Sequence, residues 1–146
     1  MKPLIKHQMQ PCQTSCVSTC VAMLLGVPAY EVISVHHEAY HAHKVSLREI
    51  LDGYGVPFEA YASVDTPDLS RVGAYLITCP SLNIDAGMHQ CIMELTEDDY
   101  YIIDPVKGRE DRRYYVNRDA KGESQVGVGG YIVDAFIPRS WLESRQ

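Results

Sequence analysis

No apolar run in this sequence is long enough to span a bilayer, and residues Met1 to His7 contain no apolar segment like that of a secretory signal. A stripe of Lys and Arg is also missing, and the formal net charge is −6. Binding to a phosphate backbone needs clustered positive charge, so nucleic acid is disfavoured as a partner. The sequence therefore predicts a cytoplasmic protein that binds neither membrane nor nucleic acid.

The sequence also lacks an internal repeat and an interdomain linker. Its 146 residues suit one compact domain spanning 1–146, and a hydrophobic content of 46% is enough for a core. Charged residues make up 22%, which argues against disorder.

The cysteines are odd in number: Cys12, Cys16, Cys20, Cys79 and Cys91. An odd count without a secretory signal argues against a disulfide framework. The first three are spaced four residues apart, but no matching second pair accompanies them, so a cysteine-based zinc site is disfavoured. A single cysteine is more often a small buried hydrophobe than a nucleophile, and Cys20, Cys79 and Cys91 are interpreted in that way.

The first third of the sequence predicts helices. They are expected over residues 16–25, from 28 to 41 and from 46 to 53. Apolar side chains recur at helical spacing in the first of them, between Thr14 or Ser15 as N-cap and Gly26 as the end. Ser46 and Glu49 form a capping-box pattern at the start of the third.

The rest of the sequence predicts strands. They are expected at residues 58–62, 74–78, 88–95, 100–103, 113–116 and 131–136, with a short helix around Trp141. Residues 117–130 are polar and rich in Gly, which predicts a loop. Helices followed by strands indicate an α+β domain, with N-terminal helices packed on a C-terminal antiparallel sheet.

Cys16, His89 and Asp104 form a candidate catalytic set. A thiol attacks as the thiolate, which a helix N-terminus and a nearby imidazolium both stabilise, and Cys16 stands at an expected helix start. His89 lies early in one expected strand, and Asp104 follows the next strand fifteen residues later. A hairpin would bring this carboxylate to the imidazole and fix its tautomer. Gln10, six residues before Cys16, can supply an oxyanion donor beside the Cys16 amide.

The order and spacing of these residues resemble the bacteriocin-processing peptidase domains, especially their short stand-alone versions from phages and bacteria. The matching motifs are Gln10, Cys16 to Gly26 with its central Ala22-Met23, Met88-His89-Gln90, and Asp104-Pro105 followed by Gly108. Together they cover about a quarter of the chain. The resemblance implies a papain-like cysteine peptidase that needs no cofactor and cleaves a peptide or protein substrate. It implies that Cys16 is the nucleophile, His89 the base, Asp104 the residue that orients the histidine, and Gln10 an oxyanion donor.

Val17 departs from the family pattern, which usually has Gly directly after the nucleophile. This departure keeps open a second hypothesis, a papain-like binding module that has lost turnover. The same set of residues would also serve amide or isopeptide hydrolysis and acyl transfer.

A third hypothesis rests on His37, Glu38 and His41, which spell the zinc-protease pattern of two histidines one helical turn apart with a Glu between them. Ala39 stands where that pattern has a bulky apolar residue, and Glu59 is the only nearby acidic candidate for a third ligand. A zinc metallohydrolase is therefore the weaker alternative. A polar helix end that flanks a substrate cleft is the preferred interpretation.

Overall fold

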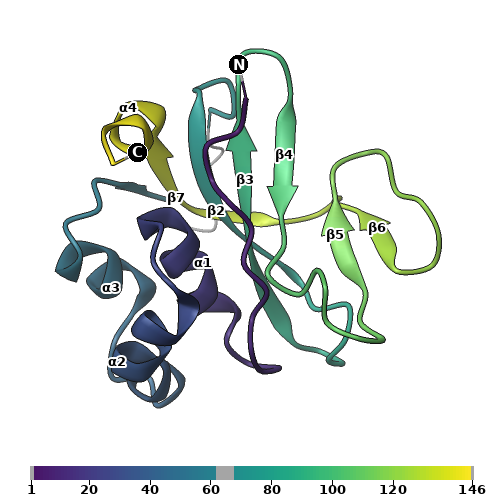
Figure 1. Cartoon of the computed structure of the whole chain (residues 1–146), viewed down its shortest axis with the longest axis horizontal. Helices are drawn as coiled ribbons and strands as arrows, with labels where there is room; N and C mark the ends of the chain where they lie inside the picture. Colours follow the sequence, from purple (N-terminus) through teal and green to yellow (C-terminus); the bar gives the residue numbers. More distant parts are fainter. Residues whose placement is uncertain (1, 62–67, 146) are drawn as a thin grey trace.

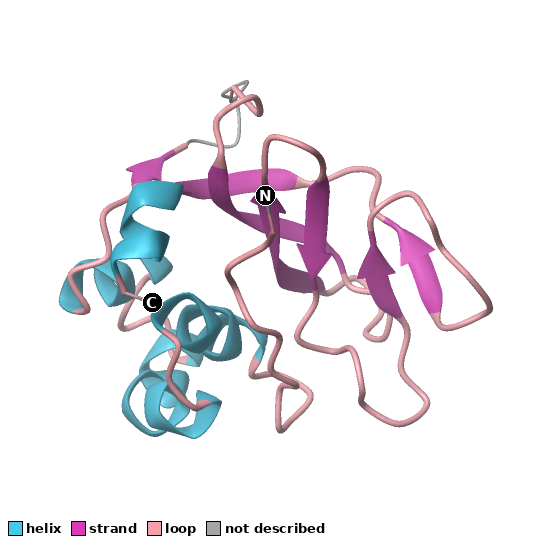
Figure 2. Cartoon of the chain, turned by 45° about the horizontal axis from the view of Figure 1, so that its top comes forward, coloured by secondary structure: helices cyan, strands magenta, loops and turns pink. Residues whose placement is uncertain are grey.

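The computed structural model describes residues 2–61 and 68–145, and it has two layers (Figure 1). Helices cover one face of a sheet, and a separate pair of short strands lies beside the sheet (Figure 2). The helices described are α1 (Cys16–Leu25), α2 (Ala29–His41), α3 (Leu47–Gly53) and α4 (Arg139–Ser144). The strands described are β1 (Glu59–Ala60), β2 (Gly73–Pro80), β3 (Met88–Leu95), β4 (Tyr100–Ile103), β5 (Tyr114–Val116), β6 (Gln125–Gly127) and β7 (Ile132–Pro138). The expected α+β class is thus confirmed.

The helix boundaries follow the local signals in the sequence. Helix α1 ends where Gly26 adopts a left-handed φ of 71°, a conformation that costs glycine little. The capping box of α3 is formed, because Glu49 N–H donates to Ser46 Oγ and Ser46 N–H donates to Glu49 Oε1. At α1 the N-cap is Ser15, but its side chain bonds to the backbone of Cys12 instead of capping the helix.

The main sheet has the order β1-β7-β2-β3-β4, and its neighbouring strands are antiparallel. Two expectations were wrong. Strand β5 pairs in parallel with β6, outside the main sheet, and β6 lies inside the stretch expected to be a loop. Strand β1 comprises only Glu59 and Ala60, and Ala62 of the expected strand lies outside the described residues.

Both faces of the sheet are buried. Alternate residues of a strand point to opposite faces, so each central strand contributes side chains to two cores. On the helical side, Leu76 of β2 and Ile92 of β3 join the core formed with α1. On the other side, Ile77 of β2 and Met93 of β3 join a second core, which includes Tyr115 of β5. Helix α1 packs against β3, so its first turn lies close to the start of that strand.

The N-terminal segment, residues 4–10, runs between the helices and strands β3 and β4 (Figures 1 and 2). The fully buried carboxylate of Glu94 accepts hydrogen bonds from the amides of Leu4 (2.7 Å) and Ile5 (3.0 Å). On the helical side, Gln8 donates to Val27 O and accepts from the Ala29 amide. These bonds join the two layers and carry the chain toward the start of α1.

A search of the described helices found none with the length and apolar character needed to cross a membrane.

Candidate active site

The site forms where β4 stops short along β3. The expected hairpin is present, and its paired positions run from Leu95–Tyr100 to Ile92–Ile103. Strand β4 ends there, so the first residues of β3, including His89, have no strand partner on that side. Asp104 follows directly after Ile103 and reaches the open edge of β3.

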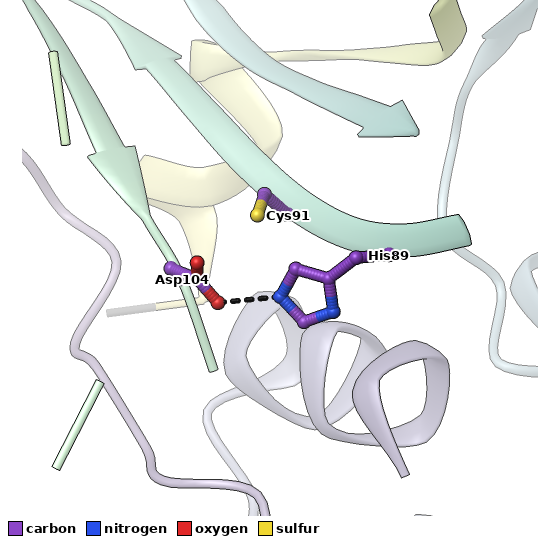
Figure 3. Close-up of side chains that lie close together, drawn as sticks. All are labelled: His89, Cys91 and Asp104. Atoms are coloured by element: carbon purple, nitrogen blue, oxygen red, sulfur yellow. Dashed lines mark hydrogen bonds and ion pairs between the residues drawn. The ribbon is translucent and has the colours of Figure 1, made fainter. Parts of the chain in front are cut away.

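Asp104 holds the ring of His89 (Figure 3). His89 Nε2 lies 2.6 Å from Asp104 Oδ1, which also accepts a hydrogen bond from the Val106 amide at 2.9 Å. Asp104 Oδ2 accepts from the Tyr115 amide at 2.7 Å, and the Asp104 side chain is only 1% exposed. A buried carboxylate that accepts from three donors is held rigidly, so it fixes the orientation of the ring.

The second ring nitrogen, Nδ1, is left to face Cys16. Burial lowers the pKa of His89, but its hydrogen bond to the Asp104 carboxylate and its interaction with Cys16 raise that pKa to about 10. The ring is therefore an imidazolium at neutral pH and lies between a carboxylate and a thiol. Figure 3 shows one ring nitrogen bonded to Asp104 and the other turned away from it.

Cys16 is the first residue of α1 and is partly exposed. Its amide has no acceptor among the described residues, as is usual for the first turn of a helix. This places a thiol beside an unpaired N–H group and the positive end of a helix dipole, an arrangement that favours a developing oxyanion at that point.

Gln10 is 1% exposed and lines the same cavity as Cys16 and His89. Its Nε2 donates to the carbonyl oxygens of Cys12 (2.8 Å) and Gln13 (3.2 Å), while its Oε1 has no partner. Both amide hydrogens are thus bonded to the loop before α1 and not directed at a substrate position. The role of Gln10 as an oxyanion donor stays a prediction.

The cavity has a volume of about 100 Å³, and its lining includes Cys16, His89, Gln10 and His41. His41 ends α2, so the polar helix end does flank the cavity, as expected.

Comparisons with family models, with curated proteins and with solved structures found no match.

Cys12 is a second exposed thiol near the site. Its partial burial raises the pKa of Cys12, but hydrogen bonds with Ser15 and Thr14 and the charge of Arg109 bring that pKa below its ordinary value. This lowered pKa could not be predicted from the sequence, because the bonds arise from the turn before α1. The other three cysteines, Cys20, Cys79 and Cys91, are buried as expected.

Two groups were considered as metal ligands. Ligand atoms of His89, Cys91 and Asp104 all lie within 4.8 Å of one another. However, the 2.6 Å between His89 Nε2 and Asp104 Oδ1 is a hydrogen-bond distance, shorter than the roughly 3.3 Å between two ligands of a tetrahedral zinc ion. The arrangement is that of a hydrogen-bonded pair.

His37 and His41 lie on one face of α2, with ring centroids 4.5 Å apart. Nε2 of His41 donates to the Thr14 carbonyl at 2.8 Å, which removes that atom from metal binding. Within residues 2–61 and 68–145, neither histidine belongs to a group of three possible ligands.

Proposed function

We propose that this chain is a papain-like thiol hydrolase, most simply a peptidase, with Cys16 as nucleophile and His89 as acid and base. The observation that supports this most strongly is the position of the His89 ring, which is hydrogen-bonded to buried Asp104 through Nε2 and lines the same cavity as Cys16. Covalent acyl transfer typically uses a nucleophile next to a base, and a third group that orients the base. The helix that begins at Cys16 and packs on an antiparallel sheet is consistent with a papain-like fold.

The reaction has two halves. The Cys16 thiolate attacks the substrate carbonyl carbon, a C–S bond forms, and the negative charge moves to the carbonyl oxygen. His89 Nδ1–H then gives its proton to the leaving amine as the C–N bond breaks, which leaves an acyl-enzyme. His89 next takes a proton from water, the hydroxide attacks the thioester, and the acid product leaves with the thiolate restored.

The oxyanion needs donors at the moment it forms. The unpaired amide of Cys16 is one. Gln10 is the proposed second donor: its weaker hydrogen bond, to the Gln13 carbonyl at 3.2 Å, is exchanged for one to the oxyanion. Removing such a donor costs about a hundredfold in kcat in comparable sites.

The test is labelling with a panel of activity-based cysteine-hydrolase probes, with the labelled residue identified by mass spectrometry. We expect Cys16 to be labelled, and we expect labelling to be lost in Cys16→Ala and His89→Ala. Cys12→Ala is the matched control and should be labelled like the wild type, because its exposed thiol lacks a histidine partner. Labelling of Cys12 with Cys16 untouched would refute the assignment, and slow labelling without turnover of any acyl substrate would favour the binding module.

A further inference from the structure

The cavity beside Cys16 is lined by positive charge in a chain that is negative as a whole. Its lining residues include Arg109 and Arg112 besides the two histidines, and none of its lining residues is acidic. The chain has a formal net charge of −6. A positive cavity on an acidic protein concentrates anions at that place, because the low-dielectric walls focus the field of the charges that line it.

Both guanidinium groups have donors to spare. Nη1 of Arg109 donates to the Gln10 carbonyl at 3.2 Å, and Nη1 of Arg112 reaches the carbonyl of its neighbour Asp111 at 3.4 Å. In the part of the chain that the structure describes, neither forms an ion pair. A guanidinium has five N–H donors in a planar fork that matches a carboxylate, so most of this capacity is open to a ligand.

The loop that carries the two arginines is ordered by its own backbone. Lys107 N–H donates to Asp104 O at 3.1 Å, Arg109 N–H donates to Val106 O at 3.0 Å, and Arg112 N–H lies 3.4 Å from Arg109 O. The loop therefore starts at the residue that orients His89. The arginines are placed by the same element that builds the catalytic set.

We propose that the cavity selects substrates that carry a carboxylate next to the bond that Cys16 attacks, and that Arg109 and Arg112 bind this carboxylate. This inference rests on the proposed function. Cys16, Arg109 and Arg112 line one cavity of about 100 Å³, so a substituent next to a carbonyl at Cys16 lies in the space that the guanidinium groups line. The carboxylate can belong to an acidic side chain or to a chain terminus.

The experiment compares two small probes of the same chemistry, iodoacetate and iodoacetamide. In both cases the Cys16 sulfur bonds to the CH₂ carbon, the C–I bond breaks and iodide leaves, but only iodoacetate carries a carboxylate. The measured quantity is the ratio of the two alkylation rates at Cys16, and each rate is measured by peptide mapping. His89 contributes to this ratio in the wild type, so the variants decide the role of the arginines.

Arg112→Glu should lower the ratio of iodoacetate to iodoacetamide rates about fivefold to twentyfold, the size expected for reversing one charge near an anion in a solvent-exposed site. Arg112→Gln removes the charge without reversing it and should lower the rate ratio by a smaller factor. This variant replaces Arg112→Glu in the test if Arg112→Glu does not fold. Arg113→Glu is the matched control, because it makes the same charge change at the next residue, which does not line this cavity. High salt should reduce the wild-type ratio.

An unchanged ratio in both Arg112 variants would overturn the inference, and so would an equal loss in Arg113→Glu, which would show an effect of net charge alone. A failure of the proposed function would be seen separately. In that case iodoacetamide would label Cys16 no faster in the wild type than in His89→Ala. Three further probes then show whether the carboxylate belongs to an acidic side chain or to a chain terminus. Chloroacetyl-Glu amide carries a side-chain carboxylate, chloroacetyl-Ala acid carries a terminal one, and chloroacetyl-Gln amide is the neutral reference. The acid probe whose rate falls more in Arg112→Glu carries its carboxylate where the substrate does.

Discussion

Asp104→Asn is the most informative single change, because it keeps the shape of the side chain and removes its charge. Asp104 Oδ1 accepts from both His89 Nε2 and the Val106 amide, whereas Oδ2 accepts only from the Tyr115 amide. Asparagine loses the fewest hydrogen bonds when its oxygen takes the place of Oδ1. Its NH₂ group then faces the Tyr115 N–H, and the two donors cannot bond to each other. A buried donor left without an acceptor costs about 1–3 kcal/mol, so we expect the free energy of unfolding to fall by about that amount.

The same change should lower the pKa of His89 from about 10, because the ring loses the charge of its partner. A hydrogen bond to a charged group contributes about 1.5–3 kcal/mol, and one pKa unit corresponds to 1.36 kcal/mol, so a fall of about one to two units is expected. A histidine pKa raised in the folded state stabilises the protein fully below its unfolded value of 6.5, and this contribution is lost as the pH rises toward 10. The alkaline loss of stability should therefore be smaller in the variant.

The assay is a ring titration of His89 by NMR, with urea unfolding at several pH values and the rate of Cys16 alkylation. Asp104→Asn should retain more activity than Cys16→Ala, since an amide oxygen can still accept a hydrogen bond from the ring. Asp134→Asn is the matched control, because that carboxylate accepts from Thr78 and Gln90 and does not touch His89. An unchanged pKa of His89 in Asp104→Asn would refute the reasoning.

The remaining predictions concern other parts of the molecule. Gln10→Ala should lower kcat about a hundredfold and leave the chain folded, and full activity would show that this amide does not act on the oxyanion. EDTA should leave activity unchanged, whereas zinc that co-purifies with the protein at one ion per chain and is needed for turnover would favour the His37–His41 hypothesis. Glu94→Ala should reduce the free energy of unfolding by about 3–5 kcal/mol in urea titrations, because it removes the acceptor of two backbone amides and one ion-pair partner of Arg139, while exposed Glu97→Ala should change it by about 0.5 kcal/mol or less.

Much of the arrangement of Cys16, His89 and Asp104 could be predicted from the sequence because its signals are local. The extent of α1 follows from the apolar spacing after Cys16 and from Gly26 at its end, and the hairpin follows from two alternating runs with a short polar turn. Once the hairpin pairs, its register alone brings Asp104 to the edge of β3. The chemistry of His89 then depends on elements that the sequence marks clearly.

Other features depend on contacts that leave no local signal. Gln10 was expected to direct its amide at the substrate, but the turn at Cys12 and Gln13 presents two carbonyl groups to it. Strand β6 is short and polar, and parallel pairing with β5 orders it, so a pattern of alternation could not mark it. Arg109 carries no local sequence signal of a site, because only the folded loop brings it to the cavity.

The route of the N-terminal segment has a consequence for synthesis of the protein. Its bonds to Glu94 and to the Asp104 carbonyl join residues 89, 90 and 97 positions apart, and the carboxylate of Asp104 also needs the Tyr115 amide. A ribosome makes Cys16 early and Tyr115 late, so the bonds that hold the His89 ring cannot all form in a nascent chain until residue 115 has emerged. Under the proposed function, Cys16 would therefore gain its oriented histidine only after residue 115 is made.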